Sequence, residues 1–183
     1  YRRTPYYLRN VERYKSMLYS NNINYARIAA IWFSRMQEDG LYILKDALFD
    51  TRSSWITKLV AGYGLRRMYR SGRMKNKALD LLKAGLNSSD RLTIKASVHS
   101  LFWMRYKSAG KTAQKILIRF LDSIGDDSSK EYIFSQIKQC MQDLLKKNRR
   151  KLDAKFYGMW NRLKNSNASH KLRHDYLSLI NQA

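Results

Sequence analysis

The spacing of apolar residues constrains the fold of this chain more than any other feature. Apolar side chains recur three and four positions apart along most of the sequence, and no long run alternates apolar with polar residues. The only proline is Pro5, so no later residue lacks the backbone N–H that a helix interior needs. The sequence therefore predicts an all-α chain of nine or ten helices joined by short turns. These helices are predicted over residues 6–19, 23–36, 41–49, 55–68, 74–86, 91–104, 112–124, 130–147, 152–163 and 169–181.

Polar turns before two of these helices supply residues that favour a helix N-terminus. Asp50 and Thr51 or Ser53 and Ser54 precede the helix 55–68, and residues 88–90 (Ser-Ser-Asp) precede the helix 91–104. Their side-chain oxygens can accept hydrogen bonds from the N–H groups of a first helical turn, which have no partner within the helix. These turns therefore predict where the two helices begin.

Three of the predicted helices contain a segment that ends in methionine and repeats at offsets of 32 and 36 residues. The segments span residues 29–36, 61–68 and 97–104. A small residue begins each segment and a large apolar residue follows four positions later: Ala29 and Phe33, Ala61 and Leu65, Ser97 and Leu101. Small residues let paired helices approach closely, and the large ones fill the layer between successive repeats.

This pattern resembles the HEAT repeat, the helix-pair unit of α-solenoids. The resemblance implies a right-handed α-solenoid of antiparallel helix pairs, forming a single helical-repeat domain over residues 1–183. The repeats are clearest over 20–125 and degenerate over 128–183, and the proline usual in the first helix of a HEAT repeat is absent. A non-repetitive helical bundle is the alternative fold.

The composition combines a folded core with a large positive charge. Hydrophobic residues make up 44% of the 183 residues, which is too many for a disordered basic tail. There are 36 lysines and arginines against 14 acidic residues, a net charge of +22. Three stretches, 66–77, 105–119 and 146–155, hold 17 of the 36, with Asp153 as their only acid.

In helix-pair repeats the turns fall alternately on two edges of the stack, and the charge separates between these edges. The basic stretches coincide with the turns between pairs, whereas the turns within pairs contain Asp50, Asp90 and the acidic residues of 122–127. One edge is therefore expected to form a basic ridge, and such a ridge is a candidate phosphate-binding surface. The ridge residues are Arg66, Arg67, Arg70, Arg73, Lys75, Lys77, Arg105, Lys107, Lys111, Lys115, Lys146, Lys147, Arg149, Arg150 and Lys151.

The first turn between pairs departs from this pattern. Arg35 is followed there by Glu38 and Asp39, so we expect the ridge to begin at the second repeat.

A nucleic acid backbone, of DNA or RNA, is the partner that such a ridge predicts. Lysine and arginine neutralise phosphates and release counterions, and arginine can pair with a phosphate through two hydrogen bonds. Aromatic residues interleaved with the ridge could stack on unpaired bases if they are exposed; these are Tyr63, Tyr69, Trp103, Tyr106, Tyr157 and Trp160. No recognised groove-reading motif occurs, so we expect sequence-tolerant binding.

Helix capping and a protein partner are alternative origins of the charge. Cations at helix C-termini are favoured by the helix dipole, which accounts for one or two basic residues per turn. An acidic protein partner docked on the basic edge of a scaffold is the alternative function. An anionic membrane fits less well, because the charge lies in turns and not along one amphipathic helix.

The sequence does not predict catalytic residues, a metal site or a cofactor. His170 and His174 are four apart, which would place them on one helix face, but no set of further ligands accompanies them. Some HEAT-like solenoids are alkylpurine DNA glycosylases, and the Trp-x-x-x-Asp element of that family is missing here. Residues 36, 59, 107 and 164, four after each tryptophan, are Met, Leu, Lys and Lys. A non-enzymatic protein is therefore expected, with glycosylase-like DNA repair as the weaker alternative.

An intracellular location is expected. Cys140 is the single cysteine, so the chain cannot form an intramolecular disulfide and fits a reducing compartment. No apolar run approaches the roughly 18 residues of a transmembrane helix.

Overall fold

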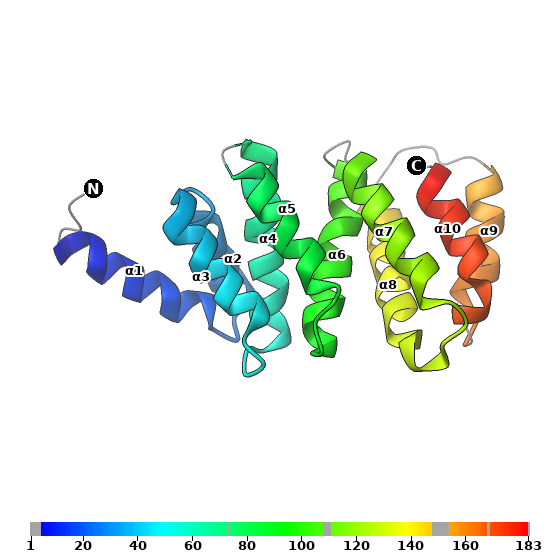
Figure 1. Ribbon diagram of the computed structural model, residues 1–183, viewed down its shortest axis with the longest axis horizontal. Coiled ribbons are helices and arrows are strands. Elements are labelled where there is room, and N and C mark those ends of the chain that lie inside the picture. Colours follow the sequence, from blue (N-terminus) through cyan, green and yellow to red (C-terminus); the bar gives the residue numbers. More distant parts are fainter. Residues whose placement is uncertain (1–4, 73, 108–110, 148–153, 168, 183) are drawn as a thin grey trace. The chain divides into compact units, whose positions relative to one another are not determined.

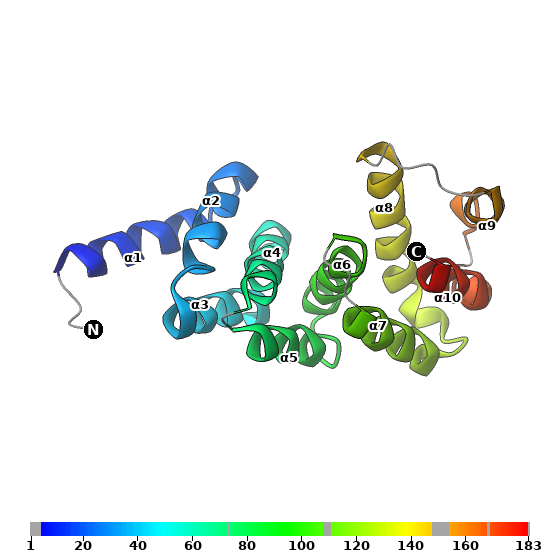
Figure 2. The ribbon, with the colours of Figure 1, turned by 90° about the horizontal axis from the view of Figure 1, so that it is seen from above.

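The computed structural model describes residues 5–72, 74–107, 111–147, 154–167 and 169–182. Within these ranges every regular element is helical and there is no strand, which confirms the predicted all-α class. Figure 1 and Figure 2 show the helices in two views. The α-helices are α1 (Pro5–Leu18), α2 (Ile23–Phe33), α3 (Gln37–Phe49), α4 (Trp55–Ser71), α5 (Lys75–Gly85), α6 (Arg91–Lys107), α7 (Lys111–Ile124), α8 (Glu131–Lys147), α9 (Ala154–Lys164) and α10 (Arg173–Gln182). Two short 3₁₀ helices are η1 (Ser128–Lys130) and η2 (Ser169–Leu172).

Two compact units make up the chain, residues 1–100 and residues 101–183. Their boundary lies inside α6. We refer to them as unit 1 and unit 2.

The packing in unit 1 centres on α4, which contacts α2, α3 and α5 (Figure 1). The small residues Ala29, Ala61 and Ser97 are fully buried, as the repeated pattern predicted. A Cβ atom on Gly64 would lie 2.8 Å from Leu44 Cδ1, so α4 and α3 approach closely at that point. Burial of these small positions lets neighbouring helices pack tightly around α4.

A buried lysine joins three helices of unit 1. Lys58 of α4 is fully buried, and its Nζ donates hydrogen bonds to Leu48 O at 2.8 Å, Asp50 O at 2.8 Å and Thr93 Oγ1 at 2.9 Å. The same Nζ lies 3.0 Å from Asp90 Oδ2. Lys58 therefore links the end of α3 and the start of α6 to the first turn of α4.

The core of unit 2 joins α8 and α10. Phe134 of α8 and Tyr176 of α10 are fully buried, and their ring centroids are 5.2 Å apart. Leu117 and Leu121 bury one face of α7, and α10 contacts both α7 and α9. This packing places the end of α8 near α9, and residues of both helices line a common pocket.

The predicted helix starts are confirmed where a side chain caps the helix. Ser54 precedes α4, and its Oγ accepts a hydrogen bond from Thr57 N at 3.2 Å. Asp90 Oδ1 accepts one from Leu92 N at 3.0 Å at the start of α6. Because these oxygens satisfy otherwise unpaired N–H groups, the helices begin where the sequence indicated.

Several predicted helices have different bounds in the structure. The helix predicted over 41–49 begins at Gln37, and those predicted over 55–68 and 91–104 continue to Ser71 and Lys107. The helix predicted over 23–36 ends at Phe33, because residues 34–36 turn and α3 already begins at Gln37. The helix predicted over 169–181 is divided into η2 and α10. Glu131 Oε2 accepts a hydrogen bond from the backbone N of His170 at 2.8 Å, and this bond fixes the tighter turn of η2.

Among the described residues, no helix has the length and apolar character needed to cross a membrane.

Candidate functional site

Three arginines from two helices surround Tyr63 in unit 1. The guanidinium carbons of Arg27, Arg66 and Arg67 lie 4.8, 5.2 and 5.8 Å from the centre of the Tyr63 ring. Arg27 Nη2 and Arg67 Nη1 also donate hydrogen bonds to the Tyr63 hydroxyl oxygen, at 3.4 and 3.3 Å. Arg27 lies on α2 and the other residues on α4, so the packing of α2 against α4 assembles the group.

The electrostatic state of Tyr63 reflects these neighbours. Burial raises the pKa of its phenol, but the hydrogen bonds and charges of Arg27 and Arg67 outweigh that effect and lower the pKa below its usual value. The face of an aromatic ring attracts guanidinium groups. Tyr63 therefore holds several like charges close together.

Arg35 and Arg67 line a pocket between the C-terminal ends of α2 and α4. The pocket has a volume of about 470 Å³, and Ser34 and Ser71 are the other described residues that line it. Ser34 Oγ donates to Ile31 O at 2.6 Å, and Ser71 Oγ donates to Met68 O at 2.9 Å. Because both hydroxyl hydrogens are used in this way, the donors available to a ligand belong to the arginines. We call Arg27, Arg35, Arg66 and Arg67 the arginine cluster.

Three members of the arginine cluster are not neutralised by described acids. Arg27, Arg35 and Arg67 form no ion pair with any carboxylate that the structure describes. Arg67 Nε is buried and has no hydrogen-bond partner there. Arg27 and Arg35 are exposed, so their guanidinium groups can reach an incoming anion.

The helix dipole accounts for only part of this arrangement. Cations near a helix C-terminus are favoured, which accounts for Arg35 beside the end of α2 and for Arg70 in the last turn of α4. Arg27 lies in the middle of α2, where the dipole effect has faded. The dipole therefore does not account for the position of Arg27 over Tyr63.

The other ridge residues of unit 1 differ in whether their charged groups are exposed or already paired. Arg70 is exposed at the end of α4. Lys75 Nζ lies 5.1 Å from the centre of the Tyr69 ring. Lys77 Nζ lies 2.6 Å from Glu38 Oε1, so its charge is already paired. Arg73 lies outside the described residues.

In unit 2 the structure places only some of the ridge side chains. Lys111 and Lys115 are exposed one turn apart on α7, and Lys146 is exposed in the last turn of α8. The side chains of Arg105, Lys107 and Lys147 lie outside the described residues, as do Arg149, Arg150 and Lys151. A ridge that continues along the whole chain stays a prediction.

The contribution of α2 to this site was not predicted from the sequence. Glu38, expected to interrupt the ridge, is paired with Lys77, and Asp39 accepts a hydrogen bond from the Tyr7 hydroxyl at 3.0 Å. Arg35 and Arg67 line one pocket, so the first turn between pairs lies beside the basic end of α4. The sequence alone could have indicated Arg35, a basic residue next to Ser34. Arg27 could not be found in this way, because only the contact of α2 with α4 brings it into the cluster.

The aromatic residues predicted for stacking are mostly covered. Trp103 and Trp160 are 5% and 6% exposed, and Tyr63 and Tyr69 are half-buried. Tyr157 is exposed, and the side chain of Tyr106 lies outside the described residues. Burial removes Trp103 as a stacking platform, because its ring is part of the core of unit 2.

The histidine pair does not lie on one helix face. His170 belongs to η2, where its Nδ1 lies 2.5 Å from Glu131 Oε2, and the exposed His174 belongs to α10. In the described part of the chain, no three His, Cys, Asp or Glu residues are grouped as metal ligands would be. Cys140 is buried in the core of unit 2.

Comparisons with protein-family models, curated proteins and solved structures gave no match to this chain.

Proposed function

We propose that this chain binds the phosphate backbone of a nucleic acid and carries out no reaction on it. The observation that carries the proposal is the arginine cluster, in which Arg27, Arg35 and Arg67 pair with no described acid. A guanidinium pairs with a phosphate through two parallel hydrogen bonds, and a net charge of +22 attracts a polyanion from a distance. The ridge residues Arg70 and Lys75 extend the same surface along the end of α4 and the start of α5.

The proposal includes the repeat architecture implied by the resemblance to HEAT repeats. The repeated large residues Phe33, Leu65 and Leu101 are all fully buried, as a layer between stacked helix pairs requires. In a solenoid each repeat contributes an equivalent turn, so basic turns would form a series of phosphate contacts along one edge. An intracellular location fits a nucleic acid ligand and a single buried cysteine.

The double variant Arg35→Gln/Arg67→Gln tests the proposal. Its matched control, Lys45→Gln/Lys83→Gln, removes the same charge from exposed positions on α3 and α5, outside the cluster. Binding of labelled single-stranded and duplex DNA and RNA is measured by fluorescence anisotropy at several salt concentrations. Each lost phosphate contact should reduce the slope of log K against log salt by about 0.7 on a single strand and about 0.9 on a duplex.

We expect the cluster variant to lose affinity for every sequence and to show the smaller slope, while the control stays near the parent protein. Equal losses in the two variants would mean that only net charge matters, and the cluster would not be the site. Indifference of binding to salt would overturn the proposal altogether.

A protein scaffold that docks an acidic partner is the second candidate. Tyr25 and Ile28 are 55% and 49% exposed and lie on α2 beside Arg27, so apolar and basic groups occur on one helix. Protein interfaces combine an apolar centre with polar surroundings. Competition by heparin separates the candidates, because a scaffold should keep its partner in the presence of a plain polyanion and a backbone binder should release its probe.

A further inference from the structure

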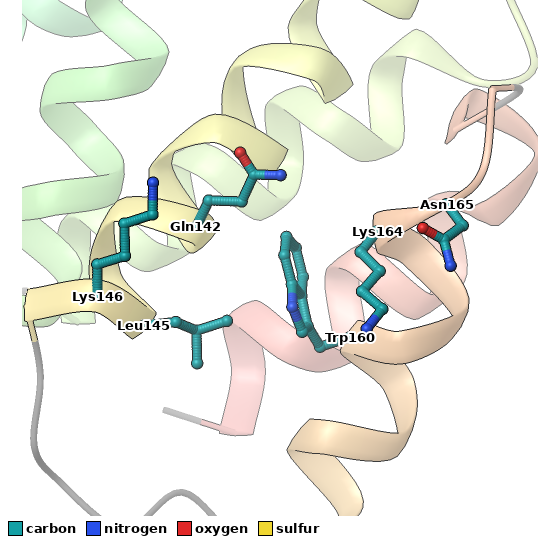
Figure 3. A pocket seen from close by; sticks show the side chains of 6 residues that line it. All are labelled: Gln142, Leu145, Lys146, Trp160, Lys164 and Asn165. Atoms are coloured by element: carbon teal, nitrogen blue, oxygen red, sulfur yellow. The ribbon is translucent and has the colours of Figure 1, made fainter.

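A second pocket lies within unit 2, between α8 and α9. Its volume is about 420 Å³. Its lining residues are Gln142, Leu145 and Lys146 from α8, with Trp160, Lys164 and Asn165 from α9 and the position after it. Figure 3 shows the Trp160 indole between the helices, with Gln142 and Leu145 on one side and Lys164 on the other.

Trp160 is the residue that most restricts what this pocket can bind. It is 6% exposed, and its only polar atom, the indole Nε1, donates to no acceptor that the structure describes. A tryptophan buried to this degree usually places its N–H on a hydrogen-bond partner. The indole Nε1 is not one of the buried side-chain atoms that lack a hydrogen-bond partner, so it is accessible from the pocket and can donate to a ligand there.

The charged and polar side chains around Trp160 define the chemistry of that ligand. Lys146 and Lys164 are exposed and form no ion pair with a described carboxylate, and none of the described residues that line the pocket is acidic. The amides of Gln142 and Asn165 have no described hydrogen-bond partner, so each offers a donor and an acceptor. Leu145 supplies apolar contact. The pocket thus suits an anionic group joined to a flat group whose edge carries both donors and acceptors.

We propose that this pocket binds one unpaired nucleotide of a single-stranded nucleic acid. The base lies against Leu145, beside the small accessible part of Trp160, and a ring nitrogen or carbonyl oxygen of the base accepts from the indole N–H. The two amides contact the edge of the base, which is accessible only when the base is unpaired. Lys146 and Lys164 neutralise the phosphates on either side.

This inference rests on the proposed binding of nucleic acid and adds a preference for unpaired bases. Its test compares two labelled probes of about twelve nucleotides, a length in the range of single-strand binding sites. One probe is oligothymidylate, and the other is an abasic strand with the same backbone and charge. The abasic probe reports phosphate binding alone, so failure of the proposed function appears as loss of binding to both probes.

We expect the parent chain to bind oligothymidylate roughly tenfold more tightly than the abasic strand, because base contacts add to backbone contacts. Trp160→Phe should bring that ratio close to one while leaving abasic binding intact. Asn165→Leu, at an exposed position outside the core, should lower the ratio in the same direction and tests the pocket if Trp160→Phe is poorly folded. Lys146→Gln/Lys164→Gln should weaken both probes more than the matched control Lys130→Gln/Lys171→Gln.

Equal affinity of the parent chain for the two probes would overturn the inference, even if both bind tightly. A ratio unchanged in both Trp160→Phe and Asn165→Leu would do the same. Free thymidine monophosphate, added as a competitor, distinguishes a free nucleotide from a nucleotide within a strand. If it displaces oligothymidylate at an equal concentration of nucleotide, the pocket binds a free nucleotide, and the inference of strand binding is overturned.

Discussion

At the scale of single residues, Lys58 shows how tertiary contacts can fix a charge inside an apolar core. Its ammonium meets two backbone carbonyls, a hydroxyl and the Asp90 carboxylate, so no polar atom of the side chain is left without a partner. A buried ion pair of this kind adds little over apolar packing, but removing one partner is costly because the other stays buried.

Replacing Lys58 should therefore destabilise unit 1. Lys58→Met removes the donor that Leu48 O and Asp50 O accept from, and we expect a loss of about 3 kcal/mol in the free energy of unfolding. Urea denaturation followed by circular dichroism measures it. Lys45→Met, at an exposed position on α3, is the control and should change stability by less than about 0.5 kcal/mol. Equal stability of the two variants would contradict the role of Lys58.

Asp90 makes the same contact sensitive to pH. Burial raises the pKa of Asp90, but hydrogen bonds from Lys58, the backbone N–H of Leu92 and Thr93, with the charge of Lys58, lower it below the usual 3.8. Because the folded-state pKa is depressed, the stabilisation is fully present above pH 3.8 and is lost as pH falls through the folded-state value. The melting temperature should fall on acidification, and less steeply in Asp90→Asn. A parallel fall in both proteins would assign acid lability to other groups.

At the scale of helices, alanine substitutions at two glycines distinguish the effect of packing on stability from the effect of helix propensity. A Cβ on Gly40 of α3 would collide with the backbone oxygen of Phe33, whereas a Cβ on Gly158 of α9 would meet nothing within 4 Å. Alanine is favoured over glycine inside a helix by about 1 kcal/mol. Gly158→Ala should therefore raise the melting temperature.

The same substitution at Gly40 should lower the melting temperature, because the backbone of α2 must move to make room. Calorimetry of both variants is the measurement. A higher melting temperature for Gly40→Ala would show that the turn between α2 and α3 leaves more room than the structure indicates.

At the scale of the whole molecule, a net charge of +22 opposes folding through self-repulsion. Added salt screens this repulsion, so the melting temperature should rise between low and near-physiological ionic strength. The gain should be smaller in Arg35→Gln/Arg67→Gln, where adjacent like charges are gone. A melting temperature independent of salt would mean that the folded chain already compensates its charge.

Several parts of the fold and the site could be read from the sequence. Helical spacing and a single proline indicated the all-α class, because an amphipathic helix must place its apolar residues on one face. Ser54 and Asp90 marked helix starts because capping is a local interaction. The basic end of α4 was also visible, since Arg66, Arg67 and Arg70 follow one another closely in the chain.

Tertiary structure decided which charges remain available. Lys77 is paired with Glu38, 39 residues away, and Arg35 and Arg67 from two parts of the chain line one pocket. No local pattern encodes either arrangement. The pocket beside Trp160 likewise depends on how α8 lies against α9. Sequence by itself determined the helices and the sign of the charge, because both follow from near neighbours along the chain. Packing alone decided where that charge is unpaired, because charges interact through space and only the fold sets those distances.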